Sequence, residues 1–304
     1  MSALSRLDAL AQARPEWTAW LRVVRELAPE LSDPDWDASP PPASSSSSSA
    51  AAAASDRAPL LAGAEMRPDG RALARLWDRL ASVARAQGLH AMAGDGKRGQ
   101  ATSTDEALAI FLAALNHDHA ALDQQASRAG ASAEGWRTLA QLLPMPWLHA
   151  CARRRAASQG TRWSQGYCPV CGAWPAFAEV RGVERARHLR CGRCGAGWPM
   201  PVLTCTYCAT TDHDTLGTLV ADDKMSRFAL DVCHGCSGYL KSCTTLQPTP
   251  SDEVLVTDLA SVEYDLAAVE RGFLRPPGPG IALHASLIAD PAPASSPSAT
   301  RMER

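Results

Sequence analysis

The sequence predicts an α plus small β fold: an all-helical N-terminal domain, two tandem four-cysteine metal ribbons and a C-terminal helix. Three observations lead to this prediction. Apolar residues recur at helical spacing through the first half of the chain. Four CxxC pairs then follow within 69 residues, and one apolar stripe at helical spacing returns after the last pair. At 304 residues, the chain is long enough for two domains.

Residues 1–36 are predicted to form an N-terminal helical segment. Leu4, Leu7 and Leu10 recur at spacings of three, which places them on one helix face. Pro15 stands where a second helix would begin, because proline is tolerated in the first helical turn.

Residues 37–58 are predicted to be a low-complexity linker. The stretch from Ser44 to Ala54 is a run of serines followed by a run of alanines. Such a composition cannot bury enough apolar surface to build a core. An alanine run can form a helix, and that alternative stays open, but the adjacent serines weaken it. We therefore expect a disordered linker or a surface insertion.

Residues 59–160 are predicted to be a helical domain. One amphipathic helix is expected to end at Gly88. The capping box Ser103–Glu106 is expected to open a second helix that runs to about Arg128. Ser132 is expected to cap a third helix.

Three features of this domain suggest ligands, and each has a plainer alternative. Gly94–Gly99 matches GxGxxG, but a dinucleotide site needs a preceding strand, so we expect a flexible loop. His117 and His119 would point about 200° apart on one helix, which makes them poor joint ligands. Arg153–Arg155 would complement a helix dipole or bind an anionic partner.

Eight of the ten cysteines form the four CxxC pairs. The pairs are Cys168/Cys171, Cys191/Cys194, Cys205/Cys208 and Cys233/Cys236. Two thiolates separated by two residues can bind one metal ion from a tight turn, and two such turns complete a tetrahedral site. The first two pairs are 19 residues apart and the last two are 24 residues apart. We therefore predict two consecutive ribbons, residues 161–200 and 201–246, although interleaved pairing stays open.

Each predicted site has four thiolate ligands and no position left for water or substrate, so its expected role is structural. Gly172 and Gly195 follow the second cysteine of their pairs, where such turns often need positive φ. Ala209 and Ser237 stand at the equivalent positions of the second ribbon, so we expect a looser site there. Redox thiols and disulfides are the alternatives. Chelation is expected to unfold the ribbon half while the helices persist.

Beyond the ribbons, residues 247–275 are predicted to contain one C-terminal helix. Leu259, Val262 and Leu266 lie on a single stripe of it. Residues 276–304 are rich in proline, alanine and serine, and we expect a disordered tail.

Charge and hydropathy narrow the function classes. The net charge is −2 and the pI is near 6.4, so no global basic field recruits nucleic acid. The longest apolar run, Ala107 to Leu115, is nine residues and too short for a membrane span. The N-terminus lacks the apolar segment of a signal peptide. We expect a reduced, cytoplasmic metalloprotein without nucleic-acid partner or membrane insertion.

No catalytic constellation stands out, and we predict no catalytic residues and no enzyme. Asp212–Asp214 includes a histidine that could exchange protons, but it has no adjacent nucleophile, so a solvated loop is expected. Several aromatic side chains lie close to the predicted sites: Trp163, Trp174, Trp198 and Tyr207. They could stack bases, but aromatic residues more often supply the core that a small ribbon lacks.

The order of these motifs resembles the formate dehydrogenase accessory (FdhE-type) family. The resemblance covers roughly residues 60–275. Its elements are Gly166–Gly172, Leu189–Cys194 followed by Trp198, the third pair, Cys233–Lys241, and Asp258–Leu266 leading to Gly272–Arg275.

This resemblance implies a helical N-terminal domain joined to two rubredoxin-like ribbons, with iron at the cysteine sites and zinc as the alternative. It also implies an assembly factor, or chaperone, that binds the formate dehydrogenase catalytic subunit in the cytoplasm before export. We expect its recognition surface where ribbons and helices meet, near Arg153–Arg155 and helix 254–273. A homo-oligomer is also open.

Two other function classes stay open. One is a rubredoxin-like electron carrier or redox maturation enzyme, which a reversible visible spectrum on reduction would support. The other is a ribbon-type nucleic-acid-binding protein, which salt-dependent binding to single-stranded DNA would support.

Overall fold

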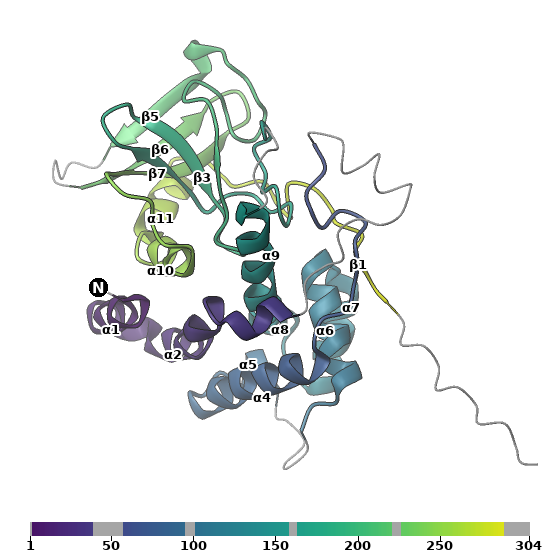
Figure 1. Ribbon diagram of the computed structural model, residues 1–304. Coiled ribbons are helices and arrows are strands. Elements are labelled where there is room, and N and C mark those ends of the chain that lie inside the picture. Colours follow the sequence, from purple (N-terminus) through teal and green to yellow (C-terminus); the bar gives the residue numbers. More distant parts are fainter. Residues whose placement is uncertain (1, 39–56, 95–100, 158–162, 221–225, 289–304) are drawn as a thin grey trace, which may run out of the picture.

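The structure is a computed structural model that describes residues 2–38, 57–94, 101–157, 163–220 and 226–288. A helical half lies below a half built around a twisted sheet in the view of Figure 1. The helical half contains α1 (Ala3–Ala13), α2 (Thr18–Leu27), α4 (Gly70–Ala86), α5 (His90–Ala93), α6 (Thr104–Asn116), α7 (His119–Ala129), α8 (Ala133–Ala140) and α9 (Met145–Ala157). Short 3-10 turns η1 (Pro15–Trp17), η2 (Ala28–Leu31) and η3 (Pro34–Ala38) follow α1 and α2.

The helices begin where the sequence supplies caps. The Ser103 hydroxyl accepts a hydrogen bond from the Glu106 amide, and the Ser132 hydroxyl accepts one from Gly135, as predicted. Aromatic pairs then fix the packing of the apolar faces. Trp77 of α4 meets Trp136 of α8 edge to face, with ring centroids 4.9 Å apart.

The prediction of one continuous helix from Ser103 to about Arg128 is wrong. It divides into α6 and α7 because His117 adopts a left-handed conformation (φ 55°) and the Asp118 carboxylate caps the next helix by accepting from the Ala121 amide. His117 and His119 therefore do not share one helix.

The two predicted ribbons share one six-stranded sheet. Its strands are β2 (Phe177–Arg181), β3 (Ala186–Arg190), β4 (Gly197–Pro199), β5 (Leu216–Val220), β6 (Phe228–Cys233) and β7 (Gly238–Thr245). The strand order is β4-β3-β2-β7-β6-β5, and each ribbon contributes three antiparallel strands. The ribbons join through the parallel pair β2–β7, in which Phe177 lies opposite Lys241.

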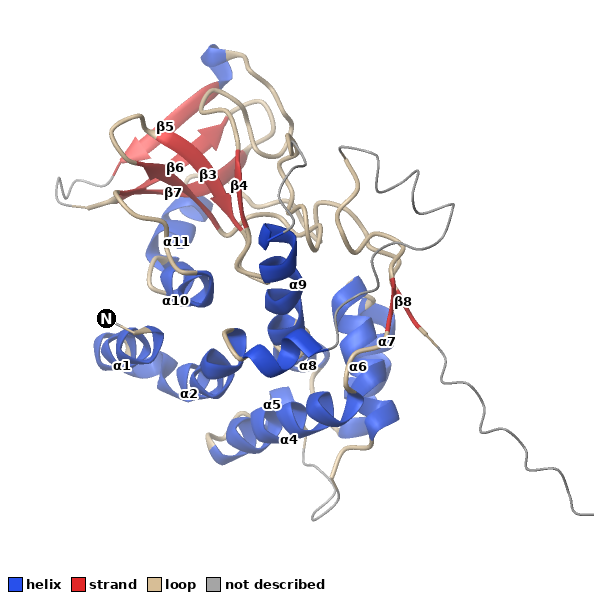
Figure 2. Cartoon of the chain, viewed as in Figure 1, coloured by secondary structure: helices blue, strands red, loops and turns tan. Residues whose placement is uncertain are grey.

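The predicted C-terminal helix is two short helices, α10 (Val254–Leu259) and α11 (Val262–Glu270). The break lies at Ser261, whose hydroxyl donates to the carbonyls of Thr257 and Asp258. This side chain satisfies carbonyls that a continuous helix would pair with backbone amides. Figure 2 shows α10 and α11 between the sheet and α1. Leu7 and Leu21 from the start of the chain pack with Val256 of α10 in one cluster.

The prediction of a disordered tail from residue 276 is wrong for the part up to residue 288, which is ordered. Residues Ser286–Leu287 form β8, which pairs in parallel with β1 (Glu65–Met66). Leu283 and Ala285 are buried, so apolar residues between the prolines have partners that the local composition does not reveal. Residues 289–304 lie outside the described part of the chain, as do residues 39–56 of the predicted linker and residues 95–100 of the predicted loop.

One hydrophobic core runs from the helical half into the first ribbon. It includes Phe111, Trp147 and Leu148 from the helices and Leu189 and Trp198 from the sheet. A core that is continuous across residue 160 means that helices and first ribbon stabilise one another. Within the described residues, the helices lack the length and apolar character required to cross a membrane.

Candidate metal centres

The first four-cysteine group lies at the end of the sheet that faces the helical half. Cys168 and Cys171 occupy the turn before β2, and Cys191 and Cys194 occupy the turn between β3 and β4. The Sγ–Sγ distances are 3.4 Å for Cys168–Cys194, 3.5 Å for Cys171–Cys191 and 3.9 Å for Cys171–Cys194. All four residues are 0% exposed.

The two turns of this group are shaped alike. In the first, the Gly172 amide donates to Cys168 O and the Cys168 amide donates to Ala173 O, and Cys191 begins the same pattern in the second turn. Gly172 and Gly195 have φ of 67° and 68°, as their positions predicted. A Cβ at Gly195 would also lie 2.6 Å from Ser251 O, so this glycine is required by close packing as well.

The second four-cysteine group is more open. Sγ distances are 3.7 Å for Cys205–Cys236 and 3.8 Å for Cys208–Cys233. Cys208 and Cys236 are exposed. Its turns keep the shape of the first group's turns without glycine, because Ala209 and Ser237 have φ of 57° and 54°. Each L-residue in this conformation costs about 1 kcal/mol.

Both groups fit a tetrahedral metal ion. A metal about 2.3 Å from each sulfur would place the sulfurs about 3.8 Å apart, close to the distances observed. The ligand atoms within each group lie within 4.8 Å of one another, and the groups combine consecutive pairs. The interleaved alternative is therefore wrong. Either group could hold a metal ion, and four thiolates suit zinc and iron alike.

Bound metal would change the protonation of these thiols. Burial raises the pKa of the Cys168 and Cys194 thiols. A coordinating thiol is deprotonated outright because the ion's charge outweighs desolvation. Metal uptake at the first group would accordingly release protons from Cys168 and Cys194 and give a thiolate cluster whose charge the ion compensates.

Of the five arginines between residues 181 and 193, two lie at the first group, where their positive charge can offset that of thiolates. Arg193 donates to Ala114 O of α6, and Arg190 donates to Gly195 O beside Cys194. The other three arginines lie elsewhere. Arg181 pairs with Glu179, Arg187 pairs with Asp231 of the second ribbon, and Arg185 is exposed at the β2–β3 turn.

Two histidines of the helical half lie next to the second turn of the first four-cysteine group. His149 is 2% exposed, and burial lowers its pKa to about 3. His117 Nε2 accepts a hydrogen bond from Arg193, and burial lowers the pKa of His117 to about 4. Both imidazoles are therefore neutral at pH 7, and they add no positive charge beside the sulfurs.

The other residues that the sequence suggested as functional make contacts typical of structural roles. Asp212, His213 and Asp214 are exposed, and the Asp212 side chain accepts from the Asp214 amide. The aromatic residues contact each other edge to face along the chain of rings Trp163, Tyr167, Trp174 and Tyr207. Cys151 and Cys243 are buried, and burial raises the pKa of both thiols.

Arg153–Arg155, expected near a recognition surface, are engaged within the chain. Arg153 pairs with Asp37 at 2.9 Å and donates to Leu31 O. Arg154 donates to Asp37 O. Arg155 lies over the ring of Trp163. Arg153 and Arg154 therefore hold the end of the N-terminal segment against α9, and Arg155 packs on Trp163, instead of presenting free guanidinium groups.

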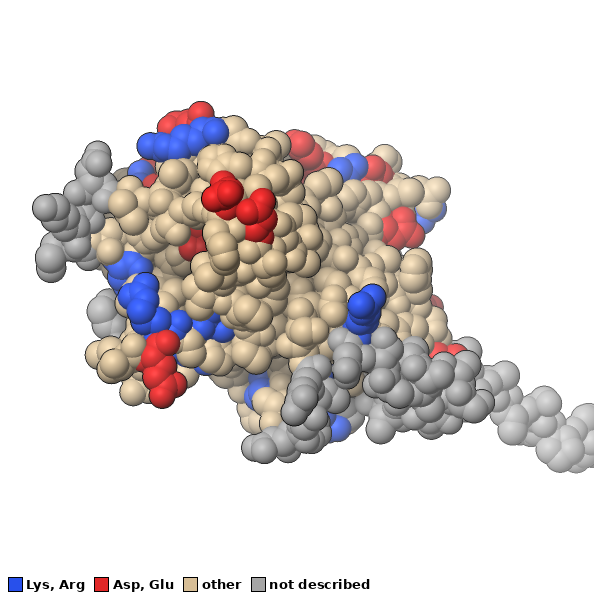
Figure 3. Space-filling model, turned by 90° about the horizontal axis from the view of Figure 1, so that it is seen from above, with Lys and Arg blue, Asp and Glu red and all other residues tan. Residues whose placement is uncertain are grey.

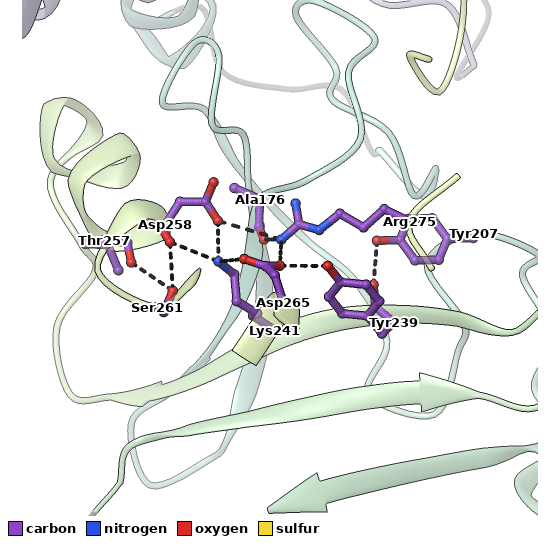
Figure 4. Close-up of polar contacts among 9 residues, drawn as sticks. All are labelled: Ala176, Tyr207, Tyr239, Lys241, Thr257, Asp258, Ser261, Asp265 and Arg275. Atoms are coloured by element: carbon purple, nitrogen blue, oxygen red, sulfur yellow. Dashed lines mark hydrogen bonds and ion pairs between the residues drawn. The ribbon is translucent and has the colours of Figure 1, made fainter. Parts of the chain in front are cut away.

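A buried charge network, which sequence reasoning missed, lies on the face of the sheet covered by α10 and α11 (Figure 4). Lys241 is 0% exposed, and its ammonium lies 2.6 Å from Asp258 Oδ1 and 2.7 Å from Asp265 Oδ2. Arg275 pairs with the other oxygen of Asp265 at 2.8 Å. The signal was a lysine in the middle of a strand with no other charged residue, and two aspartates seven residues apart.

The network reaches the second four-cysteine group through two tyrosines. Tyr239 donates to Asp265 Oδ1 at 2.8 Å, and Tyr207, which lies between Cys205 and Cys208, donates to Tyr239 O at 2.8 Å. Burial raises the pKa of Tyr239 to about 12, so its hydroxyl stays protonated and donates.

We expect reduced, purified protein to bind one metal ion per group and graded chelation to empty the second group first. Cys208 and Cys236 are open to the chelator, whereas the first group is sealed. Alkylation of released thiols, followed by mass spectrometry, identifies the group that has lost its ion. Ala209→Gly with Ser237→Gly should slow the loss, because glycine relieves both left-handed residues. Less than one equivalent of metal, or earlier labelling of Cys168 and Cys191, would contradict this prediction.

Searches for relatives identified similar proteins, although no protein-family profile matches the chain. A "Protein FdhE homolog" from Aquifex aeolicus is 32% identical over 120 residues, covering 38% of this chain and 41% of the relative. A homolog from Stutzerimonas stutzeri is 29% identical over 140 residues, covering 45% of each chain. "Protein FdhE" from an Escherichia coli strain is 28% identical over 142 residues, covering 46% of this chain and 42% of the relative.

The matched region is thus less than half the length of these curated relatives. A solved structure extends the likeness to nearly the whole chain. The crystal structure of the FdhE protein from Pseudomonas aeruginosa aligns with 92% of this chain and 94% of that chain, with a TM-score of 0.54 and 20% identity. At that identity, the match shows a common fold.

Proposed function

We propose that this chain is a member of the FdhE family and an accessory protein for formate dehydrogenase maturation. The sequence matches and the common fold support this premise. It binds the catalytic subunit in the cytoplasm before export and has no turnover of its own. The observation that carries the proposal is the pair of four-cysteine groups in the sheet of an FdhE-like fold.

The chemistry of the cysteine groups supports an assembly role over catalysis. We propose that all eight CxxC cysteines are metal ligands, with iron or zinc as the ion. Four sulfurs complete a tetrahedral shell and leave no open position for substrate. Among the described residues, the exposed Asp212–Asp214 turn is the nearest acid–base candidate, and its carboxylate already caps the local backbone. The metal ions would then stabilise the fold of the two ribbons, which in turn binds the catalytic subunit.

An electron carrier is the second candidate, and one observation favours it. Cys208 and Cys236 are exposed, so an ion in the second group would lie near solvent, where electrons can be exchanged. A visible spectrum that changes reversibly on reduction, and disappears in Cys208→Ser, would assign this activity. Nucleic-acid binding has less support. Figure 3 shows the face of the molecule that is seen from above in the orientation of Figure 1. On this face, Lys and Arg lie in small groups among Asp, Glu and uncharged residues, without the continuous basic surface that nucleic-acid binding needs.

We expect deletion of the gene to lower formate dehydrogenase activity while transcript levels of the enzyme stay unchanged. An accessory protein acts after translation, so the catalytic subunit is made but not matured. Activity staining and transcript measurement in the deletion strain test this, with the wild-type gene on a plasmid as the control that restores activity. Normal activity in a deletion strain without a second gene copy would overturn the proposed function.

A further inference from the structure

The face of the sheet opposite α10 and α11 carries an open groove. Side chains alternate along β7, so Tyr239 and Lys241 face the helices while Leu240, Ser242 and Thr244 face the groove. The groove has a volume of about 710 Å³. Its walls are β5 on one side and the segment 202–206 on the other.

Apolar side chains on both walls are strongly exposed. Val202 is 60% exposed, Leu203 57% and Val220 76%. Three large apolar residues around one concavity indicate a binding surface, whereas single exposed apolar residues are ordinary. Their position in the groove distinguishes them from Leu266, which is 59% exposed on α11.

The wall that carries Val202 and Leu203 is held in place by a buried arginine. Arg187 is 5% exposed and donates to Pro201 O at 3.3 Å and to Thr204 O at 3.2 Å. It also pairs with Asp231 at 3.1 Å. These contacts come from β3 and β6, so the groove is formed before any ligand arrives, which lowers the ordering cost of binding.

Among the described residues, the unpaired charged side chains of the groove are positive, and the two metal-group cysteines that also line it, Cys205 and Cys233, are only 6% and 2% exposed. Arg185 and Arg227 line it, and neither forms an ion pair with a described residue. Asp231 is the acidic lining residue, and it is already paired with Arg187. A ligand with carboxylate groups would therefore complement the groove.

The shape favours an extended chain. β5 is the last strand of the sheet, and its outer edge pairs with no strand of the described residues. A free strand edge beside apolar subsites is the arrangement that binds a peptide by strand addition. A second copy of this chain fits less well, because a symmetric dimer through this groove would bring Arg185 and Arg227 of both copies together.

We propose that this groove binds an extended peptide segment of the formate dehydrogenase catalytic subunit, and this inference rests on the proposed function. The segment lies along β5, places apolar side chains against Val202, Leu203 and Val220, and pairs a carboxylate with Arg185 or Arg227.

Affinity for the purified catalytic subunit tests the groove. Leu203→Asp and the pair Arg185→Glu with Arg227→Glu should each weaken binding about tenfold or more. The charge-reversed pair should also lose the salt dependence of association. Leu266→Asp is a matched change on α11, within the recognition surface expected from the sequence, and it should bind like wild type because the proposed contacts lie on the opposite face. Circular dichroism establishes that each variant is folded, and Leu203→Ser replaces Leu203→Asp if the latter is not.

The outcomes separate the two proposals. If the wild-type chain does not bind the subunit, the proposed function fails. If wild type binds and the groove variants bind equally well, the groove proposal alone fails. Overlapping synthetic peptides of the subunit should include a binder with alternating apolar residues and a carboxylate. If light scattering instead shows a wild-type dimer that Leu203→Asp converts to a monomer, the occupant is a second copy and the proposal is overturned.

Discussion

Replacing Cys171 with serine is expected to unfold the helical half together with the first ribbon. The first turn holds distant segments through backbone hydrogen bonds: Leu61 N donates to Val170 O at 3.1 Å, and Ile281 N donates to Gly172 O at 3.1 Å. A structural metal contributes on the order of 10 kcal/mol, which is comparable with the whole stability of a domain. Because the core is continuous, that loss reaches the helices.

Thermal unfolding followed by far-UV circular dichroism measures this effect. Cys208→Ser is the matched control, because Cys208 belongs to the exposed group and should leave the melting of the helices near that of wild type. Sequence reasoning alone expects chelation to spare the helices, since it treats the two halves as separate units. A Cys171→Ser protein whose helices melt at the wild-type temperature would restore that simpler expectation.

Replacing Asp265 with alanine is expected to destabilise the fold by about 3–5 kcal/mol. Its carboxylate accepts from Tyr239, Arg275 and Lys241, and the Lys241 ammonium has no access to solvent. Removing the carboxylate leaves a buried positive charge with Asp258 alone as its acidic partner. Urea denaturation should show a lower midpoint with an unchanged slope.

Two further variants show whether charge causes this loss. Glu263→Ala removes a carboxylate from the same helix, but its pair with Arg14 is solvent-exposed, so the change should be below about 1 kcal/mol. Asp265→Asn keeps the side-chain shape and removes the charge, and it should retain most of the destabilisation. A midpoint for Asp265→Ala as close to wild type as that of Glu263→Ala would show that the network stabilises little.

The sequence alone determined the local chemistry of this protein. A CxxC pair binds from one turn, so four pairs identify eight candidate ligands whatever the surrounding fold. Gly172 and Gly195 were correctly predicted to adopt positive φ, because that requirement depends on the turn itself.

Only the tertiary structure decided how these parts combine. The parallel β2–β7 pairing joins residues more than sixty positions apart, and no local pattern encodes which strands of two ribbons meet. The same holds for Lys241, whose burial is tolerable only because α10 and α11 bring the compensating carboxylates of Asp258 and Asp265 to it. Residues 281–287 look disordered by composition, yet they pack because the first metal turn and β1 supply partners. Local spacing fixes what a residue can bind, whereas burial and long-range pairing depend on the free energy of the whole chain.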